Sequence, residues 1–132
     1  MQEDYNVKVA KHYAAFRPPL HRLILEKLLT DGERFETGLD IGCGTGYSSI
    51  ALSDYCNQVV RLDPSKSMID QAEEQPSITY VHGNEAKLKD FDSNSFDVVT
   101  FAGSLYYAKN QLLFQELLRT LTPNSAIFVY DF

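Results

Sequence analysis

The stretch Gly38–Ser49, GLDIGCGTGYSS, decides the fold. It opens as a short apolar strand, passes through three glycines and continues into residues that favour a helix. A glycine-rich turn between a strand and a helix is how α/β proteins cradle a nucleotide-containing ligand, because the backbone can approach the ligand closely there. Two ligand classes fit such a turn: a dinucleotide held by its phosphates, or a positively charged nucleoside.

The glycine spacing separates these two classes. A dinucleotide fingerprint reads G-x-G-x-x-G, whereas this chain has G-x-G-x-G, with Tyr47 where the third glycine is needed. Asp40 also stands two residues before the first glycine, and its carboxylate would repel a pyrophosphate but attract an ammonium or sulfonium group. The stretch therefore favours a cationic ligand.

Composition narrows the remaining function classes. The 132 residues predict one domain of ordinary globular character, with 44% hydrophobic and 23% charged residues. A net charge of -6 with scattered basic residues disfavours a nucleic-acid partner. Cys43 and Cys56 are the only cysteines and the histidines are dispersed, so neither a disulfide framework nor a metal site is expected. No apolar run reaches signal-peptide or membrane-span length, and we expect a cytoplasmic protein with no membrane contact.

Strand and helix patterns alternate along the rest of the chain. A helix is expected over 6–16, and a second one from Leu20 to Leu28, after Pro18 and Pro19. Ser65 is placed to cap a later helix. The predicted strands cover residues 37–42, 58–63, 77–82, 96–102 and 126–132; helices follow the first at 45–54 and the fourth around 113–121, and residues 122–125 should end the last helix.

This alternation predicts an α/β fold with a Rossmann-like, doubly wound and mostly parallel sheet. Ligands bind such sheets at the carboxyl ends of the strands. The residues expected at those ends are 40–46, Asp63, 82–86 and 102–107. Asp63 is placed to accept both hydroxyls of a ribose.

Four segments together resemble the class I S-adenosylmethionine-dependent methyltransferases. The glycine stretch looks like their first motif, VVRLDPSKSMID like the segment after it, and YVHGNEAKLKDFDSNSFDVVTFAGSLYYAKN like the adenine loop and fourth strand. The N-terminal YAAFRPPLHRLI is similar to the small-molecule branch that includes the trans-aconitate and ubiquinone-biosynthesis methyltransferases. The resemblance covers nearly the whole chain and implies strand order 3-2-1-4-5, with residues 1–35 as an N-terminal helical segment and 36–132 as the core.

The resemblance also implies roles for individual residues in binding S-adenosyl-L-methionine. Asp40 would hold the methionine ammonium through water. The backbone at Gly42, Gly44 and Gly46 would pass beneath the cofactor. Asp63 would accept the two ribose hydroxyls. If the glycines only formed a tight turn and Asp63 only capped a helix, the presence of Asp40, the three glycines and Asp63 together would remain unexplained.

The adenine side of the implied site departs from the family. Relatives usually have an aspartate where this chain has Asn84, whose side-chain oxygen can still accept a hydrogen bond. The backbone N–H of Glu85 or Ala86 would donate to an adenine ring nitrogen. Pro64 would shape the turn beside the adenine, and Met68 would form an apolar wall unless it belongs to the core.

The acceptor side is less defined. Ala102 ends the fourth strand, and relatives often follow it with a His-Trp pair where this chain has Tyr106 and Tyr107. No general base is therefore assigned, and the catalytic residues stay open. Tyr13 and Arg17 would cover the sulfonium or bind a substrate carboxylate.

The family usually continues beyond the fifth strand with a helix and two more strands, which this sequence lacks. A fragment, a naturally shortened protein, or a dimer whose partner covers the strand-five edge would each explain this pattern. The leading hypothesis is a methyltransferase acting on a small molecule. A non-catalytic cofactor-binding domain is the alternative, followed by a dinucleotide-dependent oxidoreductase and a pure interaction module.

Overall fold

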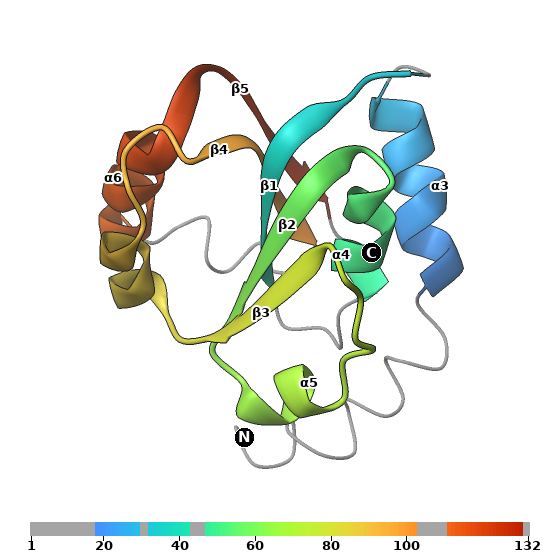
Figure 1. The fold of residues 1–132 in the computed structure, drawn as a ribbon, viewed down its shortest axis with the longest axis horizontal. Coiled ribbons are helices and arrows are strands. Elements are labelled where there is room, and N and C mark those ends of the chain that lie inside the picture. The colour runs from blue at the N-terminus through green and yellow to red at the C-terminus, as the bar shows by residue number, and fades with distance from the viewer. Residues whose placement is uncertain (1–17, 30–31, 43–46, 103–110, 131–132) are drawn as a thin grey trace.

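The computed structural model describes residues 18–29, 32–42, 47–102 and 111–130. Strands and helices alternate through these residues as the sequence predicts (Figure 1). Their bounds are α3 Pro18–Leu28, β1 Phe35–Gly42, α4 Tyr47–Ser53, β2 Cys56–Asp63, α5 Lys66–Asp70, β3 Ile78–His82, the short 3-10 helix η2 Glu85–Asp90, β4 Phe96–Ala102, α6 Gln111–Thr120 and β5 Leu121–Tyr130.

The strands form one sheet in the order β3-β2-β1-β4-β5, and every neighbouring pair is parallel. This confirms the predicted fold class and strand order. Because β1 lies in the centre, Asp40 has Arg61 of β2 on one side and Thr100 of β4 on the other. Three polar side chains therefore occupy one row across the middle of the sheet.

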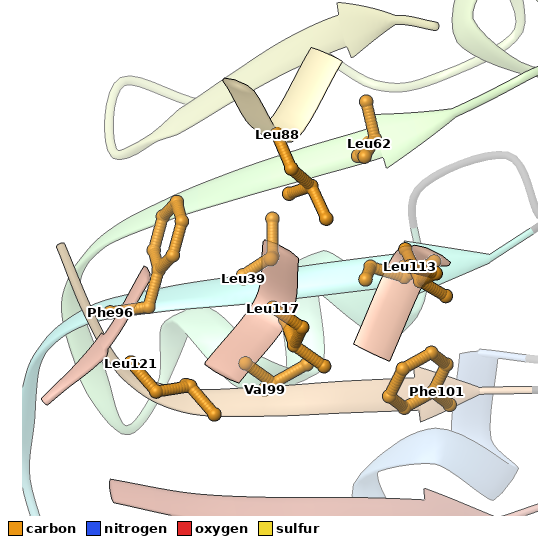
Figure 2. Packing of buried hydrophobic residues seen from close by; sticks show 10 residues of the cluster. Leu39, Leu62, Leu88, Phe96, Val99, Phe101, Leu113, Leu117 and Leu121 are labelled. Atoms are coloured by element: carbon orange, nitrogen blue, oxygen red, sulfur yellow. The ribbon is translucent and has the colours of Figure 1, made fainter. Parts of the chain in front are cut away.

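Side chains of each strand alternate between two covered faces. Helices α3 and α4 lie over one face, where Leu25 and Leu52 pack against strand residues such as Val59 and Val98. Helices η2 and α6 lie over the other face, where the core is almost entirely aliphatic and aromatic (Figure 2). Residues of that second core are Leu39, Ile41, Leu62, Leu88, Phe96, Val99, Phe101, Leu113, Leu117 and Leu121.

The face beneath α4 changes from apolar to polar along the strands. On β2, Val59 belongs to the core, and Arg61 and Asp63 follow on the same face. On β1, Gly38 allows a close approach: an added Cβ would lie 2.9 Å from the Cys56 sulfur and 3.1 Å from a Leu52 methyl. This packing fixes the distance between α4 and the strands and so positions the polar residues at their carboxyl ends.

Several expected boundaries differ from the structure. Strands β1 and β2 each begin two residues earlier than expected. The fifth strand begins at Leu121, so residues 122–125 belong to it instead of separating it from α6. The pairing passes from Phe96↔Leu121 to Val98↔Ala126, and this register shift places the additional residues in a bulge. Helix α3 begins at Pro18 because proline is tolerated in a first helical turn, where its missing N–H needs no partner. The helix expected over 6–16 lies outside the described residues.

Strand β5 forms one edge of the sheet, as predicted. Two of its apolar side chains, Ile127 and Val129, remain 38% and 44% exposed. The expected apolar edge is therefore present in the described part of the chain. Among the same residues, no helix is both long and apolar enough to cross a membrane.

Two adjacent leucines of α6 provide a test of this packing. Leu117 is fully buried in the second core, whereas Leu118 is 63% exposed. We expect Leu117→Ala to lower the free energy of unfolding by about 2–5 kcal/mol, because it leaves a cavity. Leu118→Ala on the same helix should change it by less than about 0.5 kcal/mol. Urea denaturation followed by circular dichroism measures both, and equal losses would contradict the assigned helix face.

Candidate cofactor site

Two carboxylates lie near the carboxyl ends of neighbouring central strands. Asp40 is on β1 and Asp63 ends β2, and both side chains are fully buried. A buried carboxylate is costly unless it is paired and hydrogen-bonded. The pairing here is provided by a residue between them.

Arg61 bridges the two carboxylates. Its Nη1 donates to Asp40 Oδ2 at 2.5 Å and its Nη2 donates to Asp63 Oδ2 at 3.1 Å. The Arg61 side chain is itself only 1% exposed. Two carboxylates and one guanidinium thus form a buried cluster with a formal charge of minus one.

Hydroxyl groups complete the shell of Asp40. Ser48 and Ser49 at the start of α4 donate to Oδ2 at 2.5 and 2.7 Å, and Thr100 of β4 donates to Oδ1 at 2.7 Å. Together with Arg61, these are four donors, and a carboxylate has about four lone-pair sites. Three of the donors meet at Oδ2 and one at Oδ1, so Asp40 is held by several elements and joins β1, β2, β4 and α4.

Asp63 has fewer partners. Its Oδ2 accepts from Arg61, and its Oδ1 accepts from the backbone N–H of Ser65 at 2.9 Å. Among the described residues these are its two side-chain hydrogen bonds, so about two of its four acceptor positions remain for a ligand. The two predicted acids thus differ: Asp40 is occupied, and Asp63 retains the capacity to bind two hydroxyl groups.

The pKa values of the Asp40 and Asp63 carboxyl groups also differ. Burial acts to raise the pKa of Asp40, but the Arg61 charge and the hydrogen bonds from Ser48, Ser49 and Thr100 outweigh it, and the net pKa is lowered. For Asp63, burial outweighs Arg61 and the Ser65 N–H and raises the pKa to about 6. The larger number of donors explains why Asp40 stays firmly ionised beside the same guanidinium.

A surface cavity of about 450 Å³ opens beside the end of β2. Its lining belongs to the turn after β2 and to the end of β3 with η2, which the sequence predicts as the adenine side. The lining residues are Pro64, His82, Gly83, Asn84, Ala86, Lys87 and Asp90.

Within this cavity the predicted residues differ in what they can still bind. The Asn84 side chain caps η2 by accepting from the Ala86 N–H at 3.0 Å. The Ala86 N–H is therefore already used, which leaves the N–H of Glu85 as the candidate donor to an adenine. Met68 is fully buried and does not line the cavity, so the structure favours a core role for it.

The remaining predicted positions are only partly described. Gly42 is the last residue of β1, and Ala102 pairs with it at the end of β4. The predicted positions Tyr13, Arg17, Gly44 and Gly46 lie outside the described residues, as do Tyr106 and Tyr107. Their roles stay predictions.

The comparisons with known proteins decide the family. Residues 39–129 match the family described as "Methyltransferase domain". The chain belongs to this methyltransferase family. The resemblance to class I S-adenosylmethionine-dependent methyltransferases is thereby confirmed, and the cofactor of that class is S-adenosylmethionine.

Individual relatives agree with this assignment. The chain is 35% identical over 100 residues to a cypemycin N-terminal methyltransferase of Streptomyces sp, covering 70% of this chain and 40% of that protein. It is 34% identical over 102 residues to a demethylmenaquinone methyltransferase of Oceanobacillus iheyensis, covering 70% and 42%. A solved structure described as "DhpI-SAM-HEP complex" superposes with a TM-score of 0.70 at 25% identity, over 96% of this chain and 63% of that one. This methyltransferase chain spans less than half the length of the two curated relatives.

The sequence analysis missed four functional candidates, which are Arg61, Ser48, Ser49 and Thr100. Arg61 carried a signal, because it is a charged residue between the apolar Val60 and Leu62 and lies two residues before Asp63 on the same face. The two serines and the threonine carried none, because ordinary hydroxyl residues become significant only through the side chains they contact.

We expect Asp40→Asn to lower the free energy of unfolding of this methyltransferase chain by about 3–5 kcal/mol. An amide keeps one acceptor oxygen but turns an NH2 group toward the donors, and Arg61 loses the charge it faces. Asp54→Asn is the matched control: the Asp54 side chain is 53% exposed and pairs with Arg22 at 3.4 Å. Asp54→Asn should lower the free energy of unfolding by less than about 1 kcal/mol. Guanidinium denaturation at pH 7 compares the two, and losses of similar size would contradict the assigned role of Asp40.

Proposed function

We propose that this chain is the cofactor-binding part of an enzyme that transfers a methyl group from S-adenosylmethionine to a small-molecule acceptor. The observation that carries the proposal is the arrangement of Asp63. It ends β2 beside a cavity and retains about two acceptor positions, which is the number that the two ribose hydroxyls require.

The charge of the site suits the cofactor. The ligand carries an ammonium and a sulfonium group, and the buried Asp40–Arg61–Asp63 cluster keeps a formal charge of minus one. Asp63 would hold the ribose, and the turn at Pro64 with the start of η2 would contact the adenine. Because Asp40 is fully buried and already accepts from four protein donors, its effect on the ammonium would be electrostatic, or mediated by water as first expected, and not a direct contact.

Contact with Asp63 requires local opening. Its side chain is fully buried in this structure, so the groups that cover it have to move before a ribose hydroxyl can reach it. Asp40 would stay in place during this movement, since its four donors come from two neighbouring strands, β2 and β4, and from α4.

The reaction makes few chemical demands on the protein. The cofactor supplies a methyl group activated by the adjacent sulfonium. The protein then has to position the acceptor in line with that methyl group and exclude water, which provides a large share of the acceleration in such reactions. An assigned catalytic acid or base is not required.

The cytoplasmic location, the single-domain organisation and the homodimer through the β5 edge stay predictions. The proposed small-molecule acceptor is supported by the similarity to the demethylmenaquinone methyltransferase of Oceanobacillus iheyensis. That relative acts on its own substrate, and no acceptor is transferred from it to this chain.

Calorimetric titration with S-adenosylmethionine and S-adenosylhomocysteine tests the proposal. We expect binding of both in the micromolar range, and no binding of NADH. Asp63→Ala should abolish binding, because the ribose loses its acceptor. Asp97→Ala is the control: Asp97 also accepts backbone N–H bonds, but at the opposite end of the sheet. If the unchanged chain binds neither nucleoside at millimolar concentration, the proposal fails.

Cofactor affinity should depend on pH. The proton competes with the ribose for Asp63, whose pKa is raised to about 6 by burial. Affinity should therefore be constant above about pH 7 and fall by up to roughly tenfold per unit below pH 6. Titrations from pH 7.5 to 5 measure this.

His82 lines the cavity beside Asp63. His82→Gln is the control, and it should keep the same pH profile, because the pH dependence is assigned to Asp63. An unchanged affinity down to pH 5 would show that the Asp63 carboxylate is not the ribose acceptor.

A further inference from the structure

We propose that Arg61 is a positioning residue for the cofactor, which fixes the Asp63 carboxylate in the orientation that recognises the ribose hydroxyls. This inference rests on the proposed function of the Asp63 site. It assigns the control of ribose selectivity to Arg61, which lies outside the glycine turn.

The first step of the argument is the geometry at Asp63. Two donors hold its two oxygens from different directions: the Arg61 guanidinium at Oδ2 and the Ser65 N–H at Oδ1. Together they fix the plane of the carboxylate, and this defines where its remaining lone pairs point. With Arg61 removed, a single backbone donor would hold Asp63, and the carboxylate could rotate.

The second step is that Arg61 is itself held rigidly. Its Nη1 donates to Asp40 Oδ2 and to Ser48 Oγ at 2.6 Å. Since Asp40 is in turn held by Thr100 of β4 and by two serines of α4, the position of the guanidinium is set by the core of the sheet. The glycine-turn side of the site, at β1 and α4, is thus connected through Arg61 to the ribose side at β2.

The third step is charge. Arg61 lies between two buried carboxylates, which repel each other across the site. The Arg61 charge acts to lower the pKa of Asp63 against the effect of burial. Loss of Arg61 would therefore favour protonation of Asp63, and a protonated carboxyl group accepts hydroxyl groups less well.

The experiment measures a ribose preference. This preference is the dissociation constant of the 3′-deoxyribose analogue of S-adenosylhomocysteine divided by the dissociation constant of S-adenosylhomocysteine. A general loss of stability weakens both ligands and leaves this ratio unchanged. The unchanged chain should prefer the complete ribose by at least about tenfold, because the analogue lacks one hydrogen bond to a charged group. Arg61→Met should reduce the preference to below about twofold.

Two further variants cover the case in which Arg61→Met does not fold. Asp40→Asn/Arg61→Met removes one negative charge together with the guanidinium, and it should also lose the preference. Arg61→Lys keeps the charge but presents a single ammonium to two carboxylates, and should reduce the preference at least about threefold. Cooperative denaturation and the far-ultraviolet circular dichroism spectrum identify the variants that fold.

Arg34→Met is the matched control. Arg34 also makes several hydrogen bonds near β1 and β2, to Asn57 and to the carbonyls of Asp54 and Cys56, but at the opposite end of the strands. The ribose preference of the Arg34→Met variant should equal that of the unchanged chain. A folded Arg61 variant with an unchanged preference would overturn the inference while leaving the proposed function intact. Failure of the unchanged chain to bind S-adenosylhomocysteine would overturn both.

Discussion

The rest of the structure depends on the buried pairing of Asp40 with Arg61 in the two strands at the centre of the sheet. A parallel sheet covered on both faces leaves no water for charged groups in its central strands. Each carboxylate therefore needs a cation and hydrogen-bond donors from the protein. Register satisfies this need, since Asp40 lies opposite both Arg61 and Thr100, and α4 brings Ser48 and Ser49 from above.

This pairing links the fold to the proposed function. The face of the sheet beneath α4 is apolar where the strands begin and polar where they end, so the same helix packs a core and supports a site. Close packing at Gly38 allows this, because any side chain there would meet Cys56 and Leu52. Stability and ligand recognition consequently share residues, and a substitution at Asp40 or Arg61 is expected to affect both.

The two predicted acids have different surroundings in the folded chain. Asp40 meets four donors, and its pKa is lowered. Asp63 meets two, and its pKa is raised to about 6. An acid held by many protein donors is a structural element with an electrostatic effect on its surroundings, whereas an acid with fewer partners can bind a ligand. This difference supports the proposal that Asp63 binds the ribose and that Asp40 acts on the cofactor indirectly.

The sequence by itself determined the α/β class, because hydrophobic periodicity is a local pattern. The strand order and the family followed from the resemblance of its motifs to those of the class I methyltransferases. It also located Asp40 and Asp63 at the ends of strands. It did not locate the start of β5, since the bulge at residues 122–125 depends on pairing with β4. Only the tertiary structure showed the role of Arg61, because that role comes from carboxylates on two different strands. Likewise, the number of donors around a carboxylate depends on residues distant in sequence, so only the tertiary structure separated Asp40 from Asp63.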